Sequence, residues 1–530
     1  MHIRWIKGAE WLTAILLSLA VLFLLIVRVT HAGGLWRDEC GVVQLAAMPS
    51  VSDILKNFEH QTLPLLFPLA IRFYMALFGG SDTSLKGIPL LMGLALVGAA
   101  WFNARGLERG VPLMVLALLG LNTTFLYWNG YGLTGVVLVP ALGLTAILLL
   151  RPSPAGIIAA LLACLLSVQL LINNLVLVLV IVLSAAIACL VRGFAKLGLT
   201  MAGIGLCCAA SALLYLGTYS AADWKIVLKA PAHLLSRWEP FNLALGNPAS
   251  IMPSVWYVIF LAAIIGAGYE LILIWNREDR HRSAVLIFAV LVGVLAPLAY
   301  FGTFRLSGYR SHPRHFVSLI ALLAANIDLM VAQLSRNQWV RLARLLFVIA
   351  ALVLFPIAVW PKILERQTNI DLVAQKLQEN ASPNDLIVVN PFFLGVSFYR
   401  YYHGQTPWVT VPVISEHRIH RWDLVKAKMM MPFPLGDLEQ KMGATLRSRN
   451  RIWFVGRVKI LRAGETPLSP LPAPDPEYGW QAFIYRSAWS EQVGDFVRRH
   501  AVRTDIVLPP MPAVNDLEDI PLWTAEGWQD

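Results

Sequence analysis

A series of long apolar runs constrains this chain more than any other feature. A helix needs roughly 20 mainly apolar residues to cross a bilayer. Only 14% of the 530 residues are charged, whereas soluble globular proteins carry about 25%. We therefore predict a polytopic α-helical membrane protein. The apolar runs are 10–29, 63–79, 86–102, 111–128, 133–150, 154–172, 174–191, 197–217, 251–275, 283–301, 315–334 and 341–360.

The run 63–79 differs from the others because it contains Pro64, Pro68 and a central Arg72. Prolines and a mid-run arginine are unfavourable in a helix that faces lipid. If this run does not cross and the N-terminus is cytoplasmic, every short cytoplasmic loop is basic, as the positive-inside rule requires. We therefore predict an interfacial or re-entrant helix at 63–79, about eleven transmembrane helices, and the C-terminus on the outer side.

The sequence divides near residue 360. Residues 1–360 form a predicted transmembrane catalytic domain with an outer loop at 30–85, and residues 361–530 form a predicted small α/β domain on the outer face. We expect this second domain to end in a loosely packed acidic tail. Its expected elements are helices at 368–379 and 395–402, strands at 386–389 and 452–455, and a further short β-type run at 482–485.

Composition excludes some classes of partner. The net charge of +11 does not indicate nucleic acid, because many basic residues lie between apolar runs, where they set orientation. Residues 361–530 contain no cysteine and so no disulfide framework. With the short loops, this favours a bacterial inner (plasma) membrane. No A-x-A cleavage site follows 10–29, so we expect a retained first helix. The predicted partners include membrane lipids and no nucleic acid.

Charged residues follow the first apolar run directly, in Trp36-Arg37-Asp38-Glu39-Cys40. A carboxylate just outside the first span can act as a general base on an acceptor hydroxyl or amine. Its neighbour can orient the acceptor or bind a metal ion. The alternative is that Arg37, Asp38 and Glu39 only solvate the end of a helix.

Two more residues of the outer loop are candidates. His60 can shuttle protons or bind a divalent metal ion with Asp38 and Glu39, although no metal-ligand spacing is present. Arg72 needs an anionic partner or an exit to the interface. The alternatives are an ordinary surface histidine and an arginine that only extends to the membrane surface.

A basic segment lies between the runs 283–301 and 315–334, at their predicted outward ends. An arginine cluster is unexpected there, because the positive-inside rule keeps that face poor in arginine. The planar donor fork of arginine suits phosphate, so an anionic ligand explains the cluster. Ion pairing with Asp38 or Glu39 is the alternative. The cluster consists of Arg305, Arg310, His312, Arg314 and His315.

This order of features resembles the membrane glycosyltransferases of the GT-C superfamily, in the family-39-like branch of protein mannosyltransferases and the lipid A aminoarabinose transferase. The resemblance rests on WRDE, on EHQTLPLLFPLAIRFYMALFGGSD, on KGIPLLMGL and on Pro313-Arg314-His315-Phe316. The last segment replaces the family's Pro-Arg-Tyr-x-x-Pro, with His for Tyr and no trailing Pro. Many relatives also carry an acid and an arginine near the end of the third span, where this chain has only tyrosines and uncharged neighbours at 127–132.

The resemblance implies inverting transfer of a sugar from a polyprenyl-phosphate-linked donor to a lipid, glycan or protein acceptor at the outer face of the membrane. It implies that Asp38 is the base, with support from Glu39. The expected donor phosphate-binding residues are Arg314, Arg310, Arg305 and Arg72, and the other expected cavity residues are His60, Tyr131, His312 and His315. A divalent metal ion is compatible with this reaction but not required by any motif.

Two alternatives stay open. A transporter or flippase of a lipid-linked saccharide would also need an arginine-lined cavity, but no positioned base. An oligosaccharide ligase or polymerase is a second alternative, although such enzymes usually place their main functional loop late in the chain.

Overall fold

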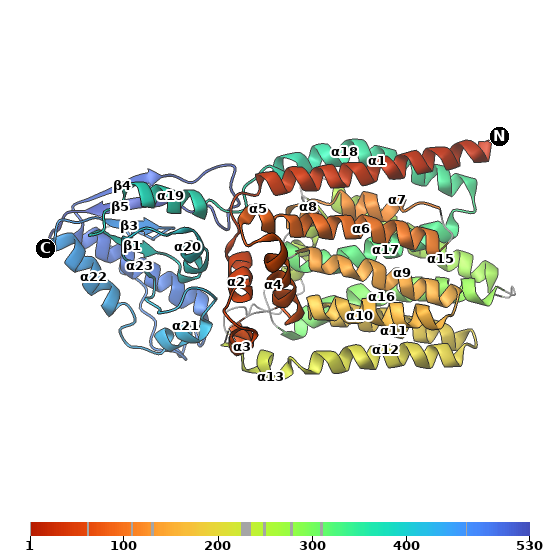
Figure 1. The fold of residues 1–530 in the computed structure, drawn as a ribbon, viewed down its shortest axis with the longest axis horizontal. Helices are drawn as coiled ribbons and strands as arrows, with labels where there is room; N and C mark the ends of the chain where they lie inside the picture. The colour runs from red at the N-terminus through yellow and green to blue at the C-terminus, as the bar shows by residue number, and fades with distance from the viewer. Residues whose placement is uncertain are drawn as a thin grey trace.

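The computed structural model describes residues 2–60, 63–107, 110–128, 132–223, 235–246, 251–275, 279–307, 311–462 and 464–530. These residues form two parts that lie end to end (Figure 1). One is a bundle of long helices, and the other contains a five-stranded sheet. The sheet-containing part follows α18 (Gln338–Ile363), so the boundary expected near residue 360 lies at the end of this helix.

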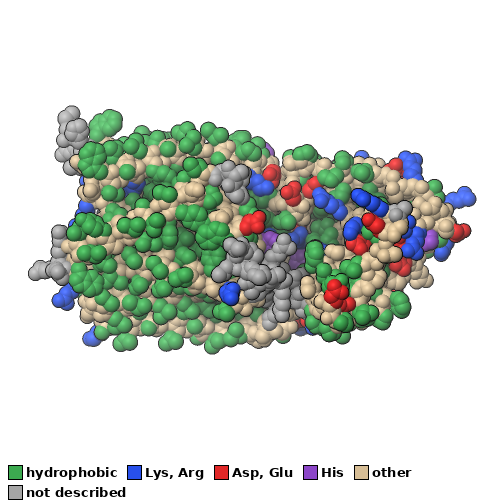
Figure 2. Space-filling view, turned by 180° about the vertical axis from the view of Figure 1, so that it is seen from behind, with side chains coloured by type: hydrophobic (Ala, Val, Ile, Leu, Met, Phe, Trp, Pro, Cys, Tyr) green, Lys and Arg blue, Asp and Glu red, His purple; other side chains and the backbone are tan. Residues whose placement is uncertain are grey.

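Eight helices among the described residues are long and apolar enough to cross a membrane. Hydrophobic side chains cover most of the visible surface of the bundle (Figure 2), as expected for a surface that faces lipid. The chain is therefore a polytopic helical protein of the membrane-embedded type, as predicted. The eight helices are α1 (His2–His31), α6 (Gly87–Gly106), α11 (Asn174–Val191), α12 (Ala195–Leu213), α15 (Met252–Ile274), α16 (Arg280–Ser307), α17 (Val317–Leu334) and α18.

Three of the predicted spans are shorter or interrupted. The runs 133–150 and 154–172 form α9 (Leu138–Leu150), which follows the short helix η3 (Gly132–Val137), and α10 (Pro154–Leu170). The run 111–128 breaks into α7 (Leu113–Val115), the π-helix η2 (Leu116–Gly120) and α8 (Thr123–Tyr127).

Asn122 lies at the break in the run 111–128. Its side chain accepts a hydrogen bond from the Phe125 amide at 2.9 Å and donates to the Ala244 and Leu245 carbonyls at 3.1 and 3.0 Å. Asn122 is fully buried. Such a break is tolerated at membrane depth because neighbouring protein, rather than lipid, satisfies the freed backbone groups.

A layer of short helices separates the two parts. α2 (Arg37–Ala46) and α4 (Leu66–Phe78) run across the ends of the long helices (Figure 1). α4 has 13 residues and belongs, with α9 and α10, to the short apolar helices of the chain. Unlike α9 and α10, it lies crosswise to the long helices (Figure 1), which is the arrangement predicted for 63–79. The other elements of this layer are α3 (Val51–Lys56), η1 (Phe58–His60) and α5 (Asp82–Leu85), with α13 (Leu216–Ala221) and α14 (Leu235–Leu245) beside them.

Arg72 lies on α4 and holds the chain that leaves α2. Its guanidinium donates to the backbone carbonyls of Ala46 at 2.9 Å, Met48 at 2.5 Å and Pro49 at 3.1 Å. These carbonyls close the C-terminal end of α2, where helices leave acceptors without intrahelical donors. Arg72 thus stabilises the C-terminal end of α2 and does not lie beside Asp38.

We expect Arg72→Met to lower the free energy of unfolding by about 2 kcal/mol, because three backbone acceptors lose a charged donor. If the sugar transfer expected from the sequence occurs, its rate per folded molecule should stay close to that of the wild type. Thermal unfolding in detergent measures the change, and Lys56→Met on the exposed end of α3 is the matched control. An unchanged melting temperature together with lost donor affinity would instead support the phosphate-binding role predicted from the sequence.

The sheet of the second part has the order β2-β1-β3-β5-β4. β1 runs parallel to β2 and β3, while β5 runs antiparallel to β3 and β4. The strands are β1 (Leu386–Val389), β2 (Trp408–Thr410), β3 (Ile452–Val455), β4 (Arg503–Leu508) and β5 (Leu522–Glu526). The helices are α19 (Ile370–Asn380), α20 (Gly395–Tyr401), α21 (Trp422–Met429), α22 (Gly436–Arg447) and α23 (Ala482–His500), with η6 (Phe392–Leu394).

Alternate side chains of β1 serve two cores. Leu386 and Val388 pack with residues of α22 and α23, whereas Ile387 and Val389 pack with residues of α19 and α20. Successive side chains of a strand point to opposite faces of the sheet, so a strand that is covered on both faces is apolar throughout. This explains why the sequence predicted β1 and β3 with correct bounds.

Two predictions for this part are wrong. Residues 482–485 do not form a strand but begin α23. Their aromatic and branched side chains suit a strand, but the apolar pattern continues at helical spacing through Trp489, Val493 and Val497, all buried. The C-terminal residues are not a loosely packed tail either. β5 is an interior strand of the sheet, because its backbone pairs on both sides.

Candidate active site at the junction

The first turn of α2 carries the two predicted carboxylates. Trp36 is the N-cap residue, and its amide donates to Glu39 Oε2 at 3.3 Å. Acidic residues are favourable in this position because the N-terminus of a helix carries partial positive charge. The sequence WRDE therefore fixes the start of the helix, and the crosswise orientation of α2 places Asp38 at the junction of the two parts.

Three basic side chains surround the Asp38 carboxylate. Arg37 Nε lies 3.7 Å from Asp38 Oδ1, Arg314 Nη2 lies 3.6 Å from Oδ2, and His420 Nε2 lies 3.6 Å from Oδ1. Although burial opposes ionisation, the His420 and arginine contacts hold the pKa of Asp38 well below its usual range. The Asp38 side chain still keeps 39% of its surface exposed, so the carboxylate is ionised and accessible to another molecule.

Arg314 enters the site from η5 (Pro313–Phe316), which precedes α17. Its guanidinium carbon lies 4.8 Å from the centre of the Trp36 ring and 5.2 Å from that of Trp128. Arginine packs favourably on aromatic faces, so the two indoles fix its position. Arg314 Nη1 is buried and has no hydrogen-bond partner among the described residues. One N–H group of the clamped guanidinium is therefore left for an anionic ligand.

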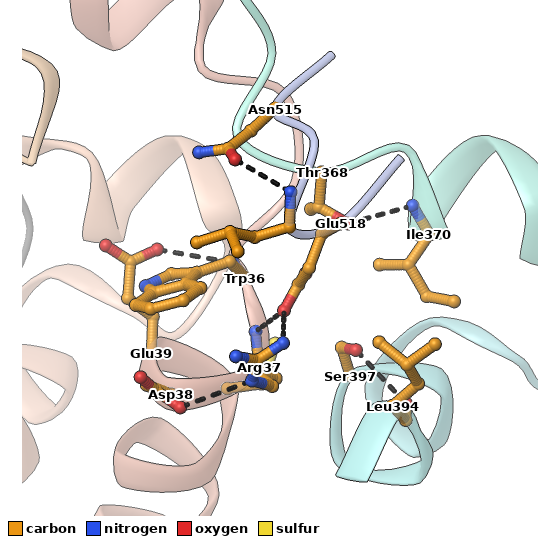
Figure 3. Close-up of polar contacts among 12 residues, drawn as sticks. Trp36, Arg37, Asp38, Glu39, Thr368, Ile370, Leu394, Ser397, Asn515 and Glu518 are labelled. Carbon is orange, nitrogen blue, oxygen red and sulfur yellow. Dashed lines mark hydrogen bonds and ion pairs between the residues drawn. The ribbon is translucent and has the colours of Figure 1, made fainter. Parts of the chain in front are cut away.

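Arg37 joins the helical bundle to the C-terminal segment. Glu518 Oε1 accepts hydrogen bonds from the Arg37 amide at 3.2 Å and from Arg37 Nη1 at 3.4 Å (Figure 3). Burial raises the pKa of Glu518 to about 7, although Arg37 opposes this shift. The ion pair between Arg37 and Asp38 is thus accompanied by a second ion pair, which links two distant segments of the chain.

Glu39 points away from Asp38 (Figure 3) and is partly buried. Burial raises the pKa of Glu39 to about 8, against the opposing effects of the Trp36 amide and Arg28. Glu39 is therefore mostly protonated at neutral pH, whereas Asp38 is ionised. The pKa of Asp38 is lowered and that of Glu39 is raised. Two adjacent carboxyl groups that differ in this way are suited to different roles.

This difference has a measurable consequence for stability. An unfolded glutamate has a pKa of about 4.3, so between that value and about 8 the folded chain binds more protons at Glu39 than the unfolded chain. The free energy of unfolding should then fall as pH rises through this window, by at most about 1.4 kcal/mol per pH unit. Glu39→Gln should flatten the profile in thermal unfolding measured from about pH 5 to about pH 8.

The control for this experiment is Glu59→Gln, which changes an exposed glutamate of the same outer loop. Glu518 also has a raised pKa, so part of the slope should remain in Glu39→Gln. An undiminished slope in Glu39→Gln would contradict the assignment of the bound proton to Glu39.

Most of the other predicted site residues that the structure describes do not contact Asp38 directly. His312 and His315 shape η5, since His315 Nδ1 accepts from the His312 amide at 3.2 Å. His60 lies beneath α21, with its Nδ1 atom 3.8 Å from Asp423. Arg305 is exposed on α16. Arg310 and Tyr131 lie outside the described residues.

Sequence reasoning missed several residues of this centre. Trp36 and Trp128 clamp Arg314, while His420 and Glu518 come from the second part of the chain. Arg28 is buried near the end of α1 and donates to the carbonyls of Tyr127 at 3.2 Å and Ile363 at 3.4 Å. Arg28 lies inside the first apolar run, as Arg72 lies inside the run 63–79. An arginine in such a place is unfavourable unless it has a partner, so the sequence could have indicated Arg28 as well. No local signal marked His420 or Glu518.

Specific contacts fix the second part against the short-helix layer. Tyr401 Oη accepts from the Leu35 amide at 2.6 Å, and Arg400 pairs with Asp82 at 2.6 Å. The Gln44 side chain donates to the Val396 carbonyl at 3.0 Å. Charged and His side chains are visible at this junction (Figure 2). The contacts hold His420 and Glu518 in register with Asp38 and Arg37.

The described residues bring together no group of three or more His, Cys, Asp and Glu side chains that could hold a metal ion. No protein-family model matches this chain, and no curated protein matches it.

Proposed function

We propose that the chain is a glycosyltransferase, in which Asp38 is the general base and Arg314 binds the phosphate of a polyprenyl-phosphate-linked sugar donor. The observation that carries this proposal is the approach of Arg314 to an ionised, accessible Asp38 at 3.6 Å. A base and a phosphate-binding cation are the two groups that such a transfer requires side by side. They come from segments far apart in the sequence.

In the proposed reaction, an acceptor hydroxyl or amine gives its proton to Asp38 as the acceptor atom bonds to the anomeric carbon of the sugar. The bond from that carbon to the phosphate oxygen breaks, and the polyprenyl phosphate leaves with the electron pair. Arg314 stabilises the charge that develops on the departing oxygen. This contact strengthens in the transition state, so it accelerates the chemical step rather than only binding the donor.

Donor binding should also activate the base. In the unliganded chain Arg314 helps to keep the pKa of Asp38 low, which makes the carboxylate a weak base. When a phosphate group takes over the N–H groups of Arg314, Asp38 loses part of this stabilisation and becomes more basic. The two Trp side chains keep the guanidinium near both anions. Base activation is thereby linked to occupancy of the donor site.

The proposed setting is the inner (plasma) membrane of a bacterium. α9, α10 and the interrupted segment from α7 to α8, together with the eight long helices, give eleven crossings. The junction then lies at the outer surface, where a prenyl tail can stay in lipid. The acceptor is a lipid, a glycan or a protein of the cell envelope.

The test is mass spectrometry of lipids and envelope glycans in a deletion strain that is complemented with wild type or Asp38→Asn. We expect one sugar to disappear from an envelope component upon deletion and to return only with wild type. Full restoration by Asp38→Asn would favour the flippase alternative, because a transporter needs no base. No change in any glycan or lipid-linked sugar would reject the proposal.

A further inference from the structure

A second basic cavity lies at the other end of the helical bundle. It has a volume of about 700 Å³ and opens where α1 begins, beside the ends of α6 and α9 and the turn between α17 and α18. α2 follows the opposite end of α1 (Figure 1), so this cavity is separated from Asp38 by the length of the bundle. Six basic side chains line it against two acidic ones, Glu10 and Asp279. The basic residues are Lys7, Arg151, Arg282, Arg336, Arg341 and Arg344.

Arg344 is the buried centre of this cavity, with only 3% of its side chain exposed. Its Nη2 group donates to Glu10, which also accepts from Arg341. Glu10 therefore pairs with two arginines, and the Asp328 carboxyl is the other acidic group that interacts electrostatically with Arg344. Arg344 Nε and Nη1 are buried and have no hydrogen-bond partner within the described ranges. Buried donors are normally satisfied, so these two nitrogen atoms indicate a ligand.

Positive charge at this end of the bundle also follows from the positive-inside rule, which needs no ligand. That rule accounts for exposed residues such as Lys7, Arg151 and Arg336. It does not account for Arg344, because a buried arginine with open donors gains nothing from the water or lipid headgroups around the protein. Arg282 offers a comparison: it is also buried, but Glu270 at 2.7 Å and the Gln333 carbonyl at 3.3 Å satisfy it.

We propose that this cavity binds a phosphate-bearing anion, with Arg344 and Arg341 as the inner ligands and the exposed basic residues at the rim. The forked donors of arginine match phosphate oxygens. Trp11, Val111 and Leu150 add an apolar wall, and the volume exceeds that of a bare phosphate ion. The ligand is therefore a phosphate ester with a larger body, either a lipid headgroup or a soluble organic phosphate. The site does not depend on the reaction proposed for Asp38.

Binding can be measured on the purified full-length chain with two probes. Dioleoylphosphatidic acid in phosphatidylcholine nanodiscs tests the lipid source by native mass spectrometry, and inorganic pyrophosphate tests the soluble source by calorimetry. We expect at least one probe to bind, and Arg344→Gln to weaken that binding about tenfold or more. Arg105→Gln is the matched control, since Arg105 is an exposed arginine near the same end of α6 but does not line the cavity.

Arg336→Gln provides a second variant, because this exposed rim residue can change without disturbing Glu10. We expect it to weaken binding about threefold. Binding of phosphatidic acid alone identifies a lipid headgroup, and binding of pyrophosphate identifies a soluble phosphate compound. The proposal is overturned if neither probe binds, or if Arg344→Gln and Arg336→Gln bind as tightly as Arg105→Gln.

Discussion

Asp38→Asn should lower the turnover of sugar transfer by about 10²- to 10⁴-fold, the range typical of a lost general base. Asparagine keeps the size of the side chain and its place in the first turn of α2, but it accepts no proton. Donor affinity should be retained or slightly improved, because Arg314 loses an anionic neighbour at 3.6 Å that competes with the donor phosphate. Steady-state kinetics and a separate donor-binding measurement resolve the two effects.

The matched control is Asp53→Asn, which makes the same change at a partly exposed position of the same outer loop. It should leave turnover unchanged. Because Asp38 also pairs with Arg37 and His420, thermal unfolding must show that the variant is folded. A folded Asp38→Asn protein with normal turnover would remove Asp38 from the mechanism, and it would leave transport of a lipid-linked saccharide as the stronger function.

Arg314→Lys should lower turnover at saturating donor by about 10²- to 10³-fold, as expected when one preorganised donor to a developing anion is lost. Lysine keeps the charge, but it lacks the planar fork and the aromatic packing that place the guanidinium between Trp36 and Trp128. The loss should appear in kcat more than in KM, because the contact with phosphate strengthens as the leaving group departs.

Arg305→Lys is the control, and it also tests an expectation from the sequence. The sequence assigns Arg305 and Arg314 to the same phosphate site, but Arg305 lies exposed on α16. The geometry therefore predicts near-normal kinetics for Arg305→Lys. Equal losses of turnover in both variants would indicate that the two arginines act at the same phosphate site. A change in KM alone for Arg314→Lys would indicate that Arg314 only binds the donor.

The sequence determined the class of protein and several elements of the fold. Apolar runs report directly on a membrane, because a lipid-facing helix must be apolar over its whole length. β1 and β3 were also predictable, since a strand that is buried on both faces is continuously apolar. The run 111–128 did not reveal its interruption at Asn122, because a buried helix break leaves hydropathy unchanged.

The sequence also predicted Asp38, Glu39 and Arg314 as site residues, because they carry charge in places where hydropathy and topology disfavour it. Only the tertiary structure decided that Asp38 and Arg314 meet and that Arg72 does not join them. The remaining members of the centre come from contacts between distant segments. Trp128 approaches α2 through the packing of the helical bundle. His420 and Glu518 approach α2 only because the second part docks on the short-helix layer. No local pattern encodes such docking, since it depends on packing across the whole junction.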